Sequence, residues 1–234
     1  MKEKPNIVIN AAALKHVPVC EDNPYESVKT NIIGHQNVIE CVSLCKPINV
    51  YGMCKAISEQ LYISFAKQQK ETKVVIVRYG NVLESTGSVI PYFKDLLEDS
   101  KTKTLPITDC DMTRFLLTLE QATDLIHWAY EYSDSHGKIA VPKVKSLKVT
   151  DIANVLIDSY DVDVSLKEIG IRPGEKLHEE MVSSEEWRKT ESLDNFLLIG
   201  SKTTNDDNHS YNSLDYLMDS SEAHDFLKES GVIK

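Results

Sequence analysis

The amino-acid sequence predicts an α/β protein whose strands form a doubly wound parallel sheet, and three observations predict it. Short apolar runs at 7–13 and 73–78 do not alternate with polar residues, which is typical of strands buried on both faces. Helical patterns stand between them, one starting at Asp22-Asn-Pro24 and one over 49–69. The 234 residues are enough for one large domain or two small ones.

The second half continues with alternating helices and extended segments. Apolar residues at helical spacing predict helices over 88–98, 119–132, 149–160 and 220–228. Extended segments are expected over 103–109, 137–141, 163–169 and 191–199, and a polar loop over 200–213. Thr150 or Asp151 is the expected N-cap of the helix over 149–160, because both side chains can accept from the first free backbone N–H groups.

Composition excludes several classes of protein. Lysine and arginine number 26 against 36 aspartates and glutamates, so the net charge is −10, and neither nucleic acid nor an anionic membrane is an expected partner. No apolar run reaches the roughly 18 residues of a membrane span. The odd count of five cysteines, without a signal sequence, favours free thiols in a reducing compartment, so we expect a cytoplasmic protein. The pairs His16/Cys20 and Cys41/Cys45 each offer only two ligands, so no metal site is expected.

Tyr51-x3-Lys55 is the first candidate for chemistry. On a helix this spacing places both side chains on one face, about 6 Å apart. A neighbouring ammonium favours the tyrosinate, so Tyr51 could act as a base, and the lysine could bind ribose hydroxyls. A core tyrosine beside an exposed lysine gives the same spacing by chance, and the motif alone does not separate the two interpretations.

Three further segments carry arginines at turns or strand ends. In Arg172-Pro-Gly-Glu-Lys176 a forked donor precedes a turn, which suits a pyrophosphate, although a solvated turn is the simpler interpretation. Arg78-Tyr-Gly-Asn81 follows a buried strand, where ligands bind in open α/β sheets. Asp111-Met-Thr-Arg114 carries a second arginine before an expected apolar helix, where either an anion or an ion pair at the helix start would fit.

Taken together, these segments resemble the extended short-chain dehydrogenase/reductase superfamily, and most closely its UDP-N-acetylglucosamine 4,6-dehydratases of polysaccharide biosynthesis. The similar runs follow one another over most of residues 5–200. They include Asn10-Ala-Ala-Ala-Leu-Lys-His-Val-Pro18, Pro47-Ile-Asn-Val-Tyr-Gly-Met-Cys-Lys55, Arg78-Tyr-Gly-Asn-Val82, Gly87-Ser-Val-Ile-Pro91, Met112-Thr-Arg-Phe115 and Gly170-Ile-Arg-Pro-Gly-Glu-Lys-Leu-His-Glu179.

The resemblance implies an incomplete Rossmann-like, NAD(P)-binding sheet with a smaller C-terminal α+β substrate domain. It divides the chain into a remnant of the cofactor domain (1–86), a region that mainly binds the UDP-sugar (87–200), and a polar loop with the last helix (201–234). It implies NADP as cofactor, held by Ala11, Ala12, Asn31, Tyr51, Lys55 and Tyr79, with Tyr51 and Lys55 also catalytic. The implied substrate residues are Lys15, Asn81, Thr108, Met112, Arg114, Arg172 and Glu175.

The sequence also departs from the pattern that it resembles. No G-x-G-x-x-G turn occurs, and Val42 and Ser43 stand where the family has the aspartate and lysine that eliminate water. We therefore expect that roughly 60–80 residues of a cofactor-binding half are missing and that the chain alone does not dehydrate a sugar. A non-catalytic UDP-sugar-binding relative and a UDP-sugar 4-epimerase are the alternatives, and a homo-oligomer is left open.

Overall fold

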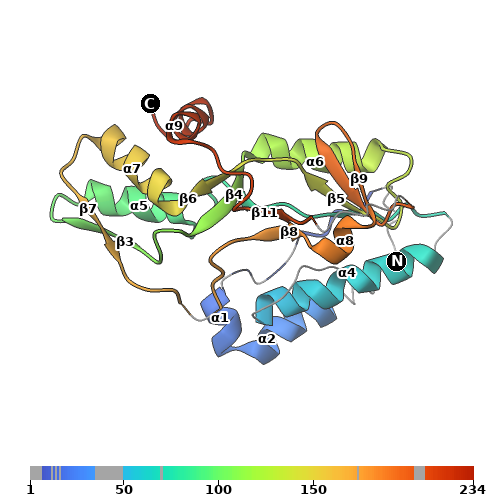
Figure 1. Cartoon of the computed structure of the whole chain (residues 1–234). Coiled ribbons are helices and arrows are strands. Elements are labelled where there is room, and N and C mark those ends of the chain that lie inside the picture. The colour runs from blue at the N-terminus through green and yellow to red at the C-terminus, as the bar shows by residue number, and fades with distance from the viewer. Residues whose placement is uncertain are drawn as a thin grey trace. The chain divides into compact units, whose positions relative to one another are not determined.

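The computed structural model describes residues 7–11, 13, 15, 17–34, 50–68, 71–172, 174–202 and 209–234. It divides into two compact units, Met1–Val74 (unit 1) and Val75–Lys234 (unit 2), and each is described by itself (Figure 1). The domain limits expected at residues 86 and 200 stay predictions. Within the described residues, no helix is both long and apolar enough to cross a membrane.

Unit 1 is helical where the structure describes it. The helices are α1 (Val17–Asp22), α2 (Pro24–Val28), the π-helix η1 (Lys29–Ile33) and α4 (Val50–Gln68). Pro24 occupies the first turn of α2, as predicted, because its missing N–H and fixed φ suit that position. The helix expected over 49–69 is confirmed as α4, and α1, α2 and η1 all pack against it.

The buried parallel strand predicted over 7–13 is wrong for the residues that the structure describes there. Residues 7–11 and 13 form no strand, and Ile7, Val8 and Ile9 are 54%, 65% and 70% exposed. A strand in a sheet interior needs a neighbour that pairs with its backbone groups, and no described strand pairs with this segment. The single parallel sheet expected to join 7–13 with 74–77 is therefore wrong as well.

Unit 2 contains four small sheets, and in the described residues the largest has four strands. This sheet has the order β1-β5-β10-β9, formed by β1 (Ile76–Val77), β5 (Ile139–Pro142), β10 (Phe196–Ile199) and β9 (Thr190–Ser192). Only β1 and β5 run parallel in it, and the other pairs are antiparallel. The strand expected over 73–78 is thus confirmed for Ile76–Val77, and Arg78 follows directly after it.

The other sheets position the candidate site. One has the order β2-β4-β6, with β2 (Asn81–Val82), β4 (Thr113–Leu117) and β6 (Ser146–Lys148). A second pairs β3 (Thr104–Ile107) in parallel with β7 (Ser165–Glu168), and a third pairs β8 (Glu180–Val182) with β11 (Tyr211–Asn212). Parallel pairing places Asn81 opposite Leu116, so β2 carries Asn81 beside the second half of β4.

Five helices of unit 2 complete this part of the fold. They are α5 (Val89–Glu98), α6 (Leu119–Glu131), α7 (Val149–Tyr160), α8 (Ser184–Trp187) and α9 (Ser220–Glu229), and the four longer ones were predicted. The N-cap of α7 is Lys148, without a side-chain cap, so the expectation of Thr150 or Asp151 is wrong. The helix begins directly where β6 ends, and the N–H of Val149 is already bonded to the carbonyl of Met112.

Among the described residues of unit 2, the buried apolar side chains include a larger and a smaller cluster. In the larger, α5, α7 and α9 gather around residues of β3, β4 and β6, with Leu105, Leu147 and Leu156 completely buried. In the smaller, α6 packs on β5 and β10 through Leu125, Ala140 and Leu198. The predicted α/β class is evident in this alternation of helices and strands.

Candidate functional site

The candidate site in unit 2 is built where β2 lies beside β4. Gly80 makes the approach possible, because a Cβ at this position would lie 2.6 Å from both Cβ and the carbonyl oxygen of Phe115. The next residue, Asn81, therefore reaches the carboxylate of Glu179, with its Nδ2 at 3.0 and 3.1 Å from the two oxygens. The sequence motif Arg78-Tyr-Gly-Asn81 thus brings a polar side chain beside β4 at the start of β2.

Glu179 also links this side chain to Arg114. Its Oε2 accepts from the backbone N–H of Phe115 at 3.0 Å, and its Oε1 lies 3.8 Å from Nε of Arg114. The Arg114 guanidinium donates to the carbonyls of Thr113 and Leu177, at 2.7 and 3.2 Å. Asn81, Arg114 and Glu179 consequently form one cluster of half-buried polar groups, in which an acid balances the charge of the arginine.

Glu179 itself is anchored by the segment around β11. Its N–H donates to Oγ of Ser213 at 2.8 Å, and its carbonyl accepts from the N–H of Ser213 at 2.7 Å. Ser213 Oγ also lies 2.6 Å from Oγ1 of Thr113, which is 2.8 Å from Nδ1 of His178. Thr113 and Ser213 are fully buried, so this network joins three distant stretches of the chain.

Arg172 and Glu175 form a turn of their own. The N–H of Glu175 donates to the carbonyl of Arg172 at 3.0 Å, and Gly174 has a φ of +81°. The Glu175 carboxylate accepts from the N–H of Arg172 at 3.1 Å and lies 3.9 Å from its guanidinium. Because the Arg172 side chain is 56% exposed, its guanidinium is accessible to an anion.

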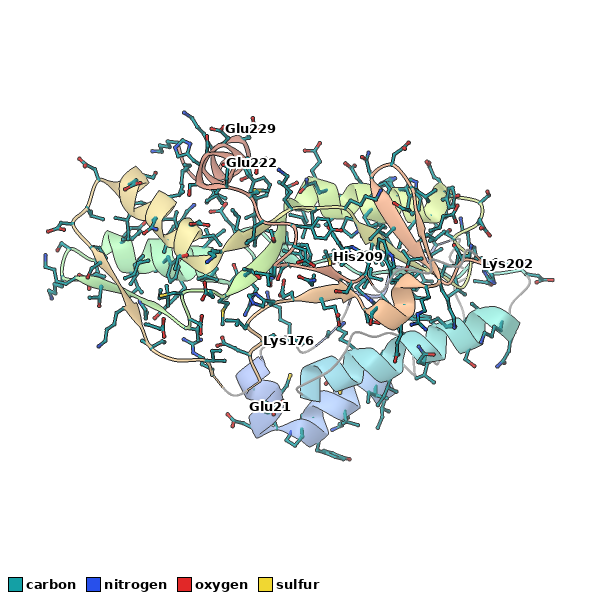
Figure 2. The ribbon with its side chains drawn as sticks, viewed as in Figure 1. Glu21, Lys176, Lys202, His209, Glu222 and Glu229 are labelled. Carbon is teal, nitrogen blue, oxygen red and sulfur yellow. The ribbon has the colours of Figure 1, made fainter. Side chains whose placement is uncertain are left out.

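The remaining predicted residues of unit 2 differ in exposure. Thr108 is half-buried and Tyr79 is exposed. Met112 is only 3% exposed and lies in the larger core, and its Sδ is 3.0 Å from Nη2 of Arg114. Any influence of Met112 on a ligand therefore passes through Arg114. Figure 2 shows Lys176, from the same motif as Arg172, on the extended segment that leads into β8.

The structure describes only some of the site residues that the sequence predicts in unit 1. Ala11 and Lys15 are exposed, whereas Asn31 is fully buried and donates from Nδ2 to Ser27 Oγ at 3.3 Å. Tyr51 and Lys55 lie one turn apart on α4, and the side chain of Tyr51, like the whole of Ala12, lies outside the described part. Burial lowers the pKa of the half-buried Lys55 ammonium, against an opposing effect of Cys54.

The expected nicotinamide dinucleotide finds only part of its usual binding groups in this chain. The assignment of Tyr51 and Lys55, one turn apart on α4, to the nicotinamide ribose stays a prediction. The pyrophosphate of such a cofactor is normally held by a glycine-rich turn before a helix N-terminus. Within the described residues, no strand of unit 1 leads into such a turn, and no G-x-G-x-x-G occurs in the sequence. The phosphates are therefore not accommodated by these residues.

The structure adds Glu179, Ser213 and His178 to the candidate site residues, because they contact residues that the sequence suggested or each other. His178 and Glu179 end the run Gly170-Ile-Arg-Pro-Gly-Glu-Lys-Leu-His-Glu179. Their place in this motif is the sequence signal that could have marked them as candidate site residues. Ser213 carries no such signal, because it lies in the stretch that the sequence predicts to be a polar loop. His209, labelled in Figure 2, packs its ring edge-on against Trp187 of α8, with centroids 4.4 Å apart.

Comparison with known proteins shows similarity over most of the chain. A family model described as a polysaccharide biosynthesis protein matches residues 1–201. A UDP-N-acetylglucosamine 4,6-dehydratase (inverting) of Campylobacter jejuni is 42% identical over 210 residues, covering 83% of this chain and 61% of the relative. A UDP-glucose 4-epimerase of Rickettsia bellii is 39% identical, covering 82% and 60%. The chain thus spans about three fifths of the length of these curated relatives.

Solved structures agree on the fold. The X-ray structure of Pen from Bacillus thuringiensis superposes with a TM-score of 0.86 at 31% identity, over 96% of this chain and 74% of that one. More distant structures, at 15%, 17% and 20% identity, include complexes with NADPH or NAD and show a likeness of fold alone. The predicted Rossmann-like α/β fold class is thereby confirmed.

Proposed function

Because the chain belongs to the polysaccharide biosynthesis protein family, we propose that it carries the sugar-nucleotide-binding part of a UDP-N-acetylglucosamine 4,6-dehydratase. The observation that supports this most directly is the cluster of Asn81, Arg114 and Glu179 beside β4, held within one unit. Arginine, amide and carboxylate groups are the donors and acceptors that phosphates and sugar hydroxyls need. The 42% identity to a dehydratase of this name favours the same ligand.

The proposal assigns a role to each candidate residue. Arg172 and Arg114 bind the pyrophosphate, and Lys15, Asn81, Thr108 and Glu175 bind hydroxyl groups of the ribose and the sugar, with Met112 supporting Arg114. Tyr51 takes a proton from a sugar hydroxyl, and the Lys55 ammonium favours its ionised form. Ala11, Ala12, Asn31 and Tyr79 would contact NADP, whose phosphates these residues do not accommodate. The odd count of five cysteines, which favours free thiols, supports a cytoplasmic location.

The proposed function does not include elimination of water by this chain on its own. The reaction needs a base for the sugar C5 proton and an acid for the departing hydroxyl. Val42 and Ser43, at the corresponding positions, can supply neither. A 4-epimerase needs no such pair, and the 39% identity to a UDP-glucose 4-epimerase makes epimerisation the second candidate.

The test has a binding arm and a product arm. In calorimetry the chain is expected to bind UDP-N-acetylglucosamine more tightly than ADP-glucose, and equal or absent binding would contradict the proposal. With NADP added, mass spectrometry is expected to show unchanged sugar nucleotide. A product lighter by one water would show that other residues perform the elimination. A product of equal mass that separates by chromatography would favour the epimerase.

A further inference from the structure

The contacts of Glu179 determine how the Asn81 amide is oriented. Both oxygens of the carboxylate lie 3.0–3.1 Å from the terminal nitrogen of Asn81, and the carbonyl oxygen of Phe115 lies 3.3 Å from it. An ionised carboxylate and a carbonyl can only accept hydrogen bonds. The atom of Asn81 that faces these three acceptors must be the NH₂ group, since an oxygen there would meet three unfavourable contacts.

This orientation leaves the other end of the amide available. The two N–H bonds of Asn81 are taken up by Glu179 and Phe115, and in the described part of the chain no residue donates to Oδ1. The Asn81 side chain is half-buried. The group of Asn81 that Glu179 and Phe115 leave without a partner in the described residues is consequently an acceptor.

We propose that Glu179 is a positioning residue that holds Asn81 with Oδ1 outward, so that this point of the site selects a ligand group that donates a hydrogen bond. The inference rests on the proposed function and deepens it: the matching group is a hydroxyl or amide N–H of the sugar nucleotide, and a phosphate oxygen is rejected there. Arg114, 3.8 Å from the same carboxylate, supplies the donor for an anionic group nearby.

The anchoring of Glu179 makes such a role physically reasonable. Its backbone is held at both its N–H and its carbonyl by Ser213, and its Oε2 by the N–H of Phe115. A carboxylate fixed at these points cannot follow Asn81 if the amide rotates. Reversal of the amide therefore costs two favourable contacts and creates unfavourable ones, which keeps a single orientation populated.

The orientation is tested first without any ligand. In ¹⁵N-labelled protein the side-chain amide signals of Asn81 are identified by their loss in Asn81→Ala. We expect Glu179→Gln to shift these signals and to speed their exchange with water several-fold, because the glutamine NH₂ can face either end of the amide. Glu185→Gln removes an exposed carboxylate of α8 and should change neither. Unchanged Asn81 signals in Glu179→Gln would overturn the proposal.

The consequence for binding is tested by a double-mutant cycle with UDP-N-acetylglucosamine. Glu179→Gln and Asn81→Ala are each expected to raise the dissociation constant five- to tenfold, and the double variant no further. Additive effects would show that Glu179 does not act through Asn81. If the unaltered chain binds no sugar nucleotide, the proposed function fails, while the NMR comparison still decides whether Glu179 positions Asn81.

Discussion

The Arg172 side chain combines a full charge with access to solvent, and Glu175 is already held by the backbone of the same turn. We expect Arg172→Ala to weaken binding of UDP-N-acetylglucosamine about 10- to 150-fold, since a charge-assisted contact contributes about 1.5–3 kcal/mol. Calorimetry measures the change, and Arg188→Ala, which removes an exposed arginine of the same unit, is the matched control. An unchanged affinity would exclude Arg172 from the site.

Arg78, in contrast to Arg172, has a structural role. It is 7% exposed, and it donates to both oxygens of Glu186, at 2.9 and 3.1 Å, and to the carbonyl of Met181. Burial disfavours the ionised form of Glu186, but the hydrogen bonds and charge of Arg78 and the contacts with Ser183 outweigh it. The pKa of Glu186 therefore lies below its usual value.

This ion pair predicts how stability depends on pH. A lowered pKa stabilises the fold above the unfolded-state value of about 4.3, and that stabilisation is lost as the pH falls through the folded-state pKa. We expect Arg78→Met to destabilise the protein by about 3–5 kcal/mol at pH 7, and by less at pH 3. Tryptophan fluorescence during urea unfolding measures this, because Trp128 and Trp187 both lie in unit 2. A difference independent of pH would contradict the assignment.

The pairing of β2 with β4 depends on one small residue. A methyl group at Gly80, directly before β2, would lie 2.6 Å from Cβ and from the carbonyl oxygen of Phe115 in β4, closer than non-bonded atoms normally approach. We expect Gly80→Ala to destabilise unit 2 by about 1–3 kcal/mol and to displace Asn81 from Glu179. Thermal unfolding measures the first effect, and the Asn81 side-chain NMR signals measure the second. Unchanged values of both would mean that β2 can shift without loss.

The C-terminal segment completes the core of unit 2. Ala223, Leu227, Val232 and Ile233 are at most 7% exposed in the larger core, and Ser213 anchors Glu179, although the match to the family model ends at residue 201. We expect a chain that ends at residue 201 to lose cooperative unfolding and near-ultraviolet circular dichroism, because these apolar contacts are removed together. Retention of a sharp unfolding transition would show that 202–234 is an addition to an independently stable domain.

The helices and strands were largely predictable because their signals are local. Pro24, the apolar spacing in α6 and the unalternating run around Ile76 each act within a few residues, and the corresponding elements were found. The run at 7–13 carried the same local signal as a buried strand. It is exposed nevertheless, because a strand also requires a paired neighbour, which lies outside the local pattern.

What the sequence by itself determined is the α/β class, most helices and the identity of the polar residues in each motif. Only the tertiary structure decided which of these residues meet. Asn81, Arg114 and Glu179 are separated by 33 and 65 positions, and their contacts depend on the pairing of β2 with β4 and on the anchoring by Ser213. Met112 and Arg78, both assigned to motifs that could bind a ligand, are buried in unit 2. Burial and long-range pairing arise from packing of the complete unit, and no short stretch of residues encodes them.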